Sequence, residues 1–136
     1  MAETKKQRSS VAGIAVSGGK VFTARRREGG DLGGKWEFPG GKVRQGETDE
    51  EALVREYGEE LSVPVEVGSP VSQVPFEHRD THFTLRAYRV KFLSGDFSFR
   101  QHSEYRWVTA EELEGLDFAE SDKLLFSQVK LLLGGS

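Results

Sequence analysis

Three glutamates, Glu56, Glu59 and Glu60, stand within five consecutive positions of the chain. Like charges three or four residues apart on a helix repel, and each pair costs about 0.2–0.5 kcal/mol. Carboxylates that converge without histidine or cysteine suit a hard divalent cation, Mg²⁺ or Mn²⁺. Magnesium is usually held by a few carboxylates together with substrate phosphates. The cluster therefore predicts a metal-assisted reaction on a phosphate compound, with a solvated acidic helix face as the alternative.

A helix over residues 48–61 is the element expected to carry the three acids. Its start is marked by a capping-box pattern, in which Thr48 is followed three residues later by Glu51. Its end is set by Pro64, which cannot continue a helix. Gly58 lies inside this helix and costs about 1 kcal/mol there, which we interpret as a packing or ligand constraint.

The acids are predicted to border the buried face of this helix. Successive helix residues are about 100° apart. One arc of the helix is apolar and forms the expected buried face: Leu53, Val54, Tyr57 and Leu61. Glu56, Glu59 and Glu60 share the adjoining sector. We therefore expect their carboxylates at the boundary between core and solvent, where their repulsion is weakly screened.

Strands are expected on both sides of this helix. The predicted strands cover residues 11–16, 20–24, 71–74, 83–92 and 105–108, with a short extended piece over residues 36–38. We also expect a loop over residues 25–34, a turn at residues 40–41, a second capped helix from Thr109 and a last helix over residues 121–133. This order is not a regular alternation of strand and helix. It predicts an α/β (α+β) fold, with a mixed sheet and helices packed on its faces.

The chain has 136 residues, enough for one domain with its own core. We expect a flexible tail over residues 1–9 and a single domain over residues 10–136. The net charge of −3 argues against a binder of nucleic-acid polymers. The chain has no cysteine, no signal-peptide pattern and no apolar run of roughly 18 residues. A cytoplasmic protein without membrane association is therefore the expectation.

The spacing around the acids resembles the Nudix box, whose pattern is G-x5-E-x7-R-E-U-x-E-E-x-G-U, where U is a bulky aliphatic residue. The matching positions are Gly41, Glu47, Arg55, Glu56, Glu59, Glu60 and Val63. The segments WEFPGGKVRQGE and SEYRWVTAEEL are similar to those of MutT-like nucleoside triphosphate pyrophosphohydrolases in this family. Two positions depart from the pattern, Ser62 in place of glycine and Tyr57 in place of U. A serine with positive φ would cost about 1 kcal/mol of strain, unless the helix ends differently.

The resemblance implies a Nudix-type α/β/α sandwich with a mixed β-sheet, and hydrolysis of a nucleoside diphosphate linked to another moiety. Glu56, Glu59 and Glu60 become the metal-ligand candidates, with the carbonyl of Gly41 as a further one. Arg55 would form an ion pair with the glutamate at position 47 and so orient these ligands. The metal, Mg²⁺ or Mn²⁺, would neutralise the phosphates and help to make a hydroxide nucleophile. MutT-like members attack the β-phosphorus, which gives a nucleoside monophosphate and pyrophosphate.

The residue that activates the water stays open. MutT-like enzymes place a glutamate in the loop after the long strand, and the matching position here is Gln101, whose amide cannot accept the proton. Glu104 is a nearby substitute, and a glutamate of the helix is the other candidate. His102 is expected to be an exposed loop histidine.

The resemblance also implies contacts with the substrate. Arg25 matches a family arginine that contacts substrate. Phe38 would line the base pocket, with core packing as the alternative. Asp122 matches a position that reads the nucleobase, and the alternative is an ordinary acid at a helix N-terminus, where the dipole favours it. A carboxyl group can read a purine or a pyrimidine edge, so oxidised guanine and cytidine nucleotides are both candidates.

The resemblance therefore predicts Mg²⁺-dependent hydrolysis of a (deoxy)nucleoside triphosphate to nucleoside monophosphate and pyrophosphate. A Nudix hydrolase of ADP-ribose or of a dinucleotide is one alternative. A catalytically silent nucleotide-binding domain used for regulation is another, and the intact acids argue against it. The expected partner is a small-molecule nucleotide, and the oligomeric state is left open.

Overall fold

The computed structural model describes residues 6–30 and 32–134 of the chain. Its first sheet contains four strands, in the spatial order β5 (Gly40–Lys42), β1 (Lys6–Ile14), β7 (Thr81–Phe92) and β6 (Val65–His78). β1 runs parallel to β7, whereas the other neighbouring strands are antiparallel. A parallel pair within an otherwise antiparallel sheet confirms the mixed sheet predicted from the sequence.

Several strands of this sheet have other bounds than predicted. β6 covers 14 residues, of which only residues 71–74 were predicted, and β7 begins at Thr81 rather than at residue 83. β1 begins at Lys6, so four residues of the predicted flexible tail are strand and pair with the start of β7. The first five residues of that tail lie outside the described residues. The predicted turn at residues 40–41 belongs to strand β5. Gly40 allows this close pairing, because a Cβ there would lie 1.9 Å from the carbonyl oxygen of Val11.

The second sheet is built around β3 (Lys20–Arg26). β3 pairs with three strands, β2 (Val16–Ser17), β4 (Trp36–Glu37) and β8 (His102–Val108). Both β3 and β8 extend beyond their predicted ends, and their register sets Arg26 opposite His102. Polar residues that were predicted to lie in loops are therefore held in a sheet, next to β4.

Helix α1 (Asp49–Leu61) confirms the predicted helix and its capping box. The side chain of Thr48 accepts the backbone N–H of Glu51, and the side chain of Glu51 accepts the backbone N–H of Thr48. After the last turn, Ser62 adopts a left-handed conformation with a φ of 54° and donates its N–H to the carbonyl of Gly58. The serine thus takes the positive φ that the family's glycine position suggested.

The buried face of α1 is shifted towards the acids. Leu53, Tyr57 and Leu61 are fully buried, as predicted. Val54 was predicted to be buried, but it is 44% exposed, whereas Glu60 is buried. The shift arises because β5 and the segment before β8 both contact the acidic sector of the helix.

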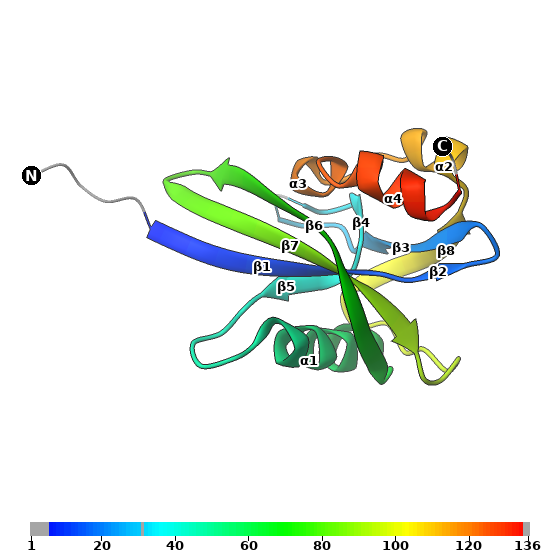
Figure 1. The fold of residues 1–136 in the computed structure, drawn as a ribbon, viewed down its shortest axis with the longest axis horizontal. Helices are drawn as coiled ribbons and strands as arrows, with labels where there is room; N and C mark the ends of the chain where they lie inside the picture. The colour runs from blue at the N-terminus through cyan, green and yellow to red at the C-terminus, as the bar shows by residue number, and fades with distance from the viewer. Residues whose placement is uncertain (1–5, 31, 135–136) are drawn as a thin grey trace, which may run out of the picture.

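Three short helices lie on the other side of the sheets, namely α2 (Ala110–Glu114), α3 (Glu120–Lys123) and α4 (Phe126–Leu132) (Figure 1). The capping box predicted at Thr109 is present. The last helix was predicted as one piece, but it is interrupted, since the N–H of Leu125 bonds to the carbonyl of Asp122, three residues back. With α1 on the opposite side, the layers form the expected α/β/α sandwich (Figure 1). None of the described helices is long and apolar enough to cross a membrane.

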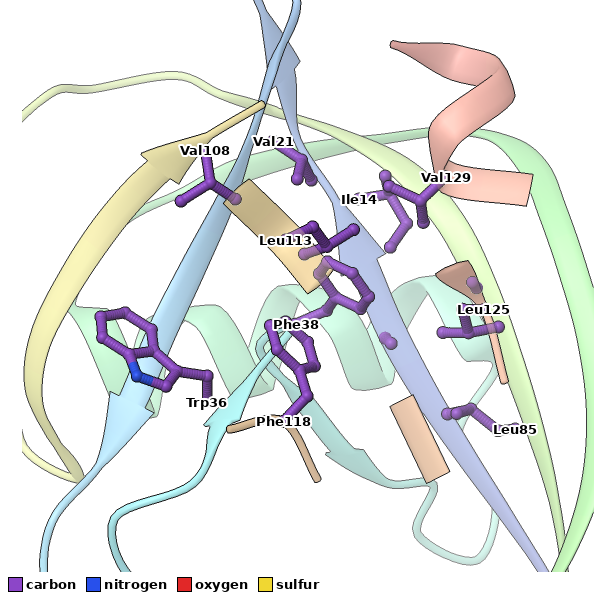
Figure 2. Close-up of a cluster of buried hydrophobic side chains, with 12 residues drawn as sticks. Ile14, Val21, Trp36, Phe38, Leu85, Val108, Leu113, Phe118, Leu125 and Val129 are labelled. Carbon is purple, nitrogen blue, oxygen red and sulfur yellow. The ribbon is translucent and has the colours of Figure 1, made fainter. Parts of the chain in front are cut away.

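Two apolar clusters fill the space between the layers. The cluster on the side of the short helices includes Ile14, Val21, Trp36, Phe38, Leu85, Val108, Leu113, Phe118, Leu125 and Val129 (Figure 2). The second cluster contains Tyr57, whose ring lies against Gly13 of β1. A Cβ at Gly13 would lie 2.2 Å from the hydroxyl of Tyr57. The tyrosine that departs from the family pattern is therefore accommodated by a glycine on the facing strand.

Candidate metal and catalytic site

An open cleft of about 590 Å³ lies between β5 and the second half of α1. Its lining mixes acidic, basic and glycine residues: Arg8, Arg26, Gly40, Gly41, Lys42, Val43, Arg44, Gln45, Arg55, Glu56, Glu59, Glu60 and Gln101. The three predicted metal ligands thus share one cleft with several cationic side chains. This composition suits a metal ion bound together with a polyanion.

Arg55 holds the acidic side of the cleft together. Its Nε and Nη2 donate to the two carboxylate oxygens of Glu47, at 2.6 and 3.0 Å. Its Nη1 donates to Glu56 at 2.6 Å and to Glu59 at 3.4 Å. The hydrogen bonds from Arg55 and from the backbone N–H of Arg44 lower the pKa of Glu47 to about 2. One guanidinium therefore keeps Glu47 ionised, orients two of the helix acids and offsets their repulsion.

Gly41 brings the backbone of β5 against the carboxylate of Glu56. A Cβ at Gly41 would lie 2.6 Å from Cδ of Glu56, and 2.7 and 2.8 Å from its two oxygens. Real Cβ atoms do not approach other atoms so closely, so any side chain here would move the carboxylate. The glycine is therefore required sterically. The role of its carbonyl as a metal ligand stays a prediction.

Glu60 is the innermost of the three acids. Its side chain is buried, and neither carboxylate oxygen has a hydrogen-bond partner among the residues that the structure describes. Burial, the neighbouring carboxylate of Glu37 and, after these, the carboxylate of Glu56 raise the pKa of Glu60 to about 10. Buried oxygens without partners fit a divalent cation, which would engage their lone pairs and favour the ionised form. Glu59 lies at the mouth of the cleft, 3.7 Å from a guanidinium nitrogen of Arg44.

A buried histidine lies behind Glu60. His102 was predicted to be exposed, but it is fully buried, because β8 begins at this residue and pairs it with Arg26. Its Nε2 lies 2.8 Å from Oε2 of Glu37 and 3.8 Å from Oε1 of Glu60. The ligand atoms of these three residues lie within 4.8 Å of one another, so the group could also hold a metal ion. Neither Glu37 nor His102 was identified from the sequence, since only long-range strand pairing brings them together.

The side chains of Arg25 and Glu104 lie apart from the acids. The two residues face each other across β3 and β8, and Nη1 of Arg25 lies 3.3 Å from Oε1 of Glu104. Neither lines the cleft, whereas Arg26 and Gln101 do. Side chains alternate along a strand, so only one of the two neighbouring arginines can face the cleft. This alternation was the available signal for Arg26, and the roles of Arg25 and Glu104 stay predictions.

Asp122 and Phe38 meet in the interior, on the side of α3. The backbone N–H of Phe38 donates to Oδ2 of Asp122 at 2.8 Å. Burial, together with the negative charge of Glu37, raises the pKa of Asp122 to about 7. The ring of Phe38 packs against Phe118 and Phe126. The structure thus brings the two predicted base contacts together, and the ring of Phe38 also packs in the core.

The chain resembles known proteins over most of its length. Residues 11–128 match the family model of the NUDIX domain. A Mycobacterium tuberculosis protein named "Putative 8-oxo-dGTP diphosphatase 2" is 42% identical over 129 residues, which cover 93% of this chain and 90% of that protein. The 8-oxo-dGTP diphosphatase of Escherichia coli is 30% identical, over 94% of this chain and 99% of its own. The CTP pyrophosphohydrolase of E. coli is 35% identical, over 82% and 83% respectively.

Solved structures show the same fold. The solution structure of the E. coli ORF135 protein has a TM-score of 0.83 at 33% identity, and the match covers 94% of this chain and 91% of that one. The crystal structure of a MutT protein from Methanosarcina mazei Go1 has a TM-score of 0.82 at 26% identity, with 94% and 96% covered. Because the family model spans most of the chain and the acids of the motif meet in one cleft, the chain belongs to the Nudix hydrolase family, as a MutT-like member.

Proposed function

We propose that the protein hydrolyses a (deoxy)nucleoside triphosphate to a nucleoside monophosphate and pyrophosphate, with Mg²⁺ as its cofactor. The observation that carries this proposal is the convergence of Glu56, Glu59 and Glu60 on one cleft, where Arg55 orients two of them. The E. coli relatives carry names that refer to nucleoside triphosphates, 8-oxo-dGTP and CTP, which supports this substrate class.

In this proposal the acids hold the cation, and basic side chains of the cleft hold the phosphates. When bound, the metal ion neutralises phosphate charge and polarises the attacking water. Arg55 fixes the carboxylate of Glu56, for which Gly41 leaves room. Four cationic side chains in the same lining suit a triphosphate: Arg8, Arg26, Lys42 and Arg44.

We assign the activation of water to a glutamate of α1. Gln101 lines the cleft, but its amide cannot accept a proton. Glu104 pairs with Arg25 and is not part of the lining. A general base must lie within hydrogen-bond reach of its proton, directly or through one water. The helix acids, which share the cleft with the proposed cation, meet this condition better, and attack would occur at the β-phosphorus.

We assign the reading of the nucleobase to Asp122, and Phe38 keeps its proposed role of lining the base pocket. The backbone N–H of Phe38 donates to Oδ2 of Asp122 and so holds the carboxyl group in place. A carboxylate accepts hydrogen bonds, and a protonated carboxyl group can also donate one, so Asp122 can pair with a purine or a pyrimidine edge. Oxidised guanine and cytosine are both candidate bases.

A substrate panel with Mg²⁺ tests the proposed reaction. The panel contains the common ribo- and deoxyribonucleoside triphosphates, 8-oxo-dGTP, ADP-ribose and a dinucleotide, with pyrophosphate and phosphate measured separately. We expect pyrophosphate from at least one triphosphate. Absence of pyrophosphate from every triphosphate would contradict the proposal. If only ADP-ribose or the dinucleotide is hydrolysed, the protein is a Nudix hydrolase of that substrate instead. Nucleotide binding without turnover would favour a regulatory domain.

The base-reading role predicts a change in discrimination. Asp122→Ala should alter the ratio of kcat/KM values between guanine and cytosine triphosphates, because the carboxyl group proposed to pair with the base edge is lost. Glu120→Ala, an exposed acid on the same helix, is the matched control and should leave the ratio unchanged. An equal loss on all bases in Asp122→Ala would refute base reading. The cytoplasmic location expected from the sequence stays a proposal that cell fractionation can test.

A further inference from the structure

We propose that His102, held by Glu37, positions the carboxylate of Glu60 for the cation in the cleft. The inference rests on the proposed function, which requires a cation at Glu60. Both positioning residues lie outside the Nudix box, which runs from Gly41 to Val63. They come from β8 and β4, and they reach the acids only because both strands are part of the sheet around β3.

A chain of polar contacts leads from the sheet to Glu60. Arg26 donates to the two carboxylate oxygens of Glu37, at 3.4 and 3.3 Å. Glu37 accepts in turn from Nε2 of His102 at 2.8 Å. Because a carboxylate can only accept, this ring nitrogen carries the proton of the bond. The ring is thereby fixed in one orientation, with the same nitrogen 3.8 Å from Oε1 of Glu60.

The backbone around Glu60 is anchored to the segment that leads into β8. The N–H of Arg100 donates to the carbonyl of Glu60 at 3.2 Å, and the N–H of Ser98 donates to the carbonyl of Leu61 at 2.9 Å. The carboxylate of Glu60, in contrast, lacks a hydrogen-bond partner among residues 6–30 and 32–134. His102 is a fully buried polar neighbour of this carboxylate, and it limits the directions in which the acid can point.

His102 acts on Glu60, the proposed metal ligand, and does not bind the cation itself. Its Nε2 is engaged by Glu37, and the guanidinium of Arg26 beside Glu37 would repel a cation placed there. Magnesium also prefers oxygen ligands to imidazole. Groups that orient a metal ligand without touching the metal commonly change metal affinity by about 10–100-fold when they are mutated.

Cation binding in the absence of nucleotide tests this role directly. Mg²⁺ is titrated calorimetrically into the wild-type protein, His102→Met and His102→Gln. His102→Met keeps much of the side-chain volume but has no N–H, so we expect about 10–100-fold weaker binding. His102→Gln retains an N–H donor near the Nε2 position and should bind nearly as tightly as wild type. His82→Met, which removes a histidine paired with Glu77 outside the cleft, is the matched control and should have no effect.

A second variant covers the case in which His102→Met does not fold. Glu37→Leu removes the same hydrogen bond from its other end, and Glu37→Gln, which loses the same charge but keeps an acceptor for the Nε2–H, is its control. Mg²⁺ binding should be about 10–100-fold weaker in Glu37→Leu than in Glu37→Gln. In His102→Met, and in Glu37→Leu relative to Glu37→Gln, pyrophosphate release should require more Mg²⁺, while the KM for nucleotide at saturating Mg²⁺ is unchanged. A residue with a packing role alone would lower the melting temperature without shifting the Mg²⁺ requirement.

Two results would overturn the inference. Equal Mg²⁺ affinity in the wild type, His102→Met and His102→Gln would leave His102 with a packing role only. A histidine nitrogen coupling in the magnetic resonance spectrum of bound Mn²⁺, absent in His102→Gln, would show that the ring is a ligand. A wild-type protein that binds no divalent cation would contradict the proposed function itself, and the positioning role with it.

Discussion

Gly41 controls whether the carboxylate of Glu56 can lie against β5. Gly41→Ala should lower Mg²⁺-dependent pyrophosphate release by about 100-fold, because the new Cβ would displace a group that must be placed to within an ångström. Steady-state kinetics over a range of Mg²⁺ concentrations, with a melting curve to confirm folding, measures this effect. Wild-type kinetics in a folded Gly41→Ala protein would refute the steric role.

Gly58, which lies in helix α1 beside the acids, is the opposite case to Gly41. A Cβ at this position would meet nothing within 4 Å, so the packing constraint inferred from the sequence is not present among the described residues. Gly58→Ala should therefore keep full activity and raise the free energy of unfolding by about 1 kcal/mol, measured by urea denaturation. Loss of activity in this variant would mean that the helix needs its glycine for movement or for contact with substrate.

The metal side of the cleft was predictable from the sequence because local spacing determines it. Residues three and four apart share a helix face, so Glu56, Glu59 and Glu60 had to lie close together. The partners of Glu60 were not predictable in the same way. Glu37 and His102 belong to strands distant in the chain, and the burial of His102 depends on the register between β8 and β3.

At the scale of the element, α1 ends in strain. Ser62 holds a φ of 54°, a conformation that costs a residue with a Cβ about 1 kcal/mol or more. Ser62→Gly should remove this strain and raise the free energy of unfolding, by somewhat less than that amount because glycine also loses more entropy on folding. Urea denaturation of the variant beside wild type measures the gain. A destabilised variant would show that the serine makes a compensating interaction.

Helix α1 was the element best predicted, since its caps and its stop signal all lie within a few residues of it. Its buried arc was predicted less well. The periodicity placed Val54 in the core and Glu60 at the boundary between core and solvent, whereas Val54 is 44% exposed and Glu60 is buried. The last helix was predicted as continuous. The N–H groups of Leu124 and Leu125 bond three residues back, to Ser121 and Asp122, and this spacing marks its interruption.

At the scale of the whole molecule, Asp122 links α3 to the connection between β4 and β5. Its pKa is raised to about 7, from an ordinary value of 3.8. Between these two pH values Asp122 is protonated in the folded state but ionised in the unfolded state. The contribution of Asp122 to stability therefore falls as the pH rises from about 4 to about 7. The side chain in Asp122→Asn is neutral at every pH. The difference in melting temperature between Asp122→Asn and wild type should therefore be more favourable to the variant at pH 8 than at pH 4.

Asp117 provides a control of opposite sign. A hydrogen bond from Lys35 lowers the pKa of Asp117, so its contribution to stability is present at neutral pH and is lost as the pH falls through the folded pKa. The melting temperature of Asp117→Asn should therefore fall further below that of wild type at pH 8 than at low pH. The same pH dependence in wild type and in Asp122→Asn would refute the account given for Asp122.

The overall architecture was only partly predictable. The order of elements indicated a mixed sheet with helices on its faces, and the resemblance implied the sandwich. The parallel pairing of β1 with β7, and the division of the strands into two sheets, depend on contacts between distant segments that periodicity does not report. The start of β1 was misplaced for the same reason, since Lys6 becomes strand only through pairing with Thr81.

Pyrophosphate release as a function of Mg²⁺ concentration, compared between wild type and Glu59→Gln, tests the central claim most directly. Glu59→Gln removes one carboxylate from the proposed ligand set, so turnover should fall and the Mg²⁺ requirement should rise. Glu50→Gln, an exposed acid at the start of the same helix, is the matched control and should behave as wild type. Unchanged turnover and unchanged Mg²⁺ dependence in Glu59→Gln would contradict the assignment of this acidic cluster as the metal site.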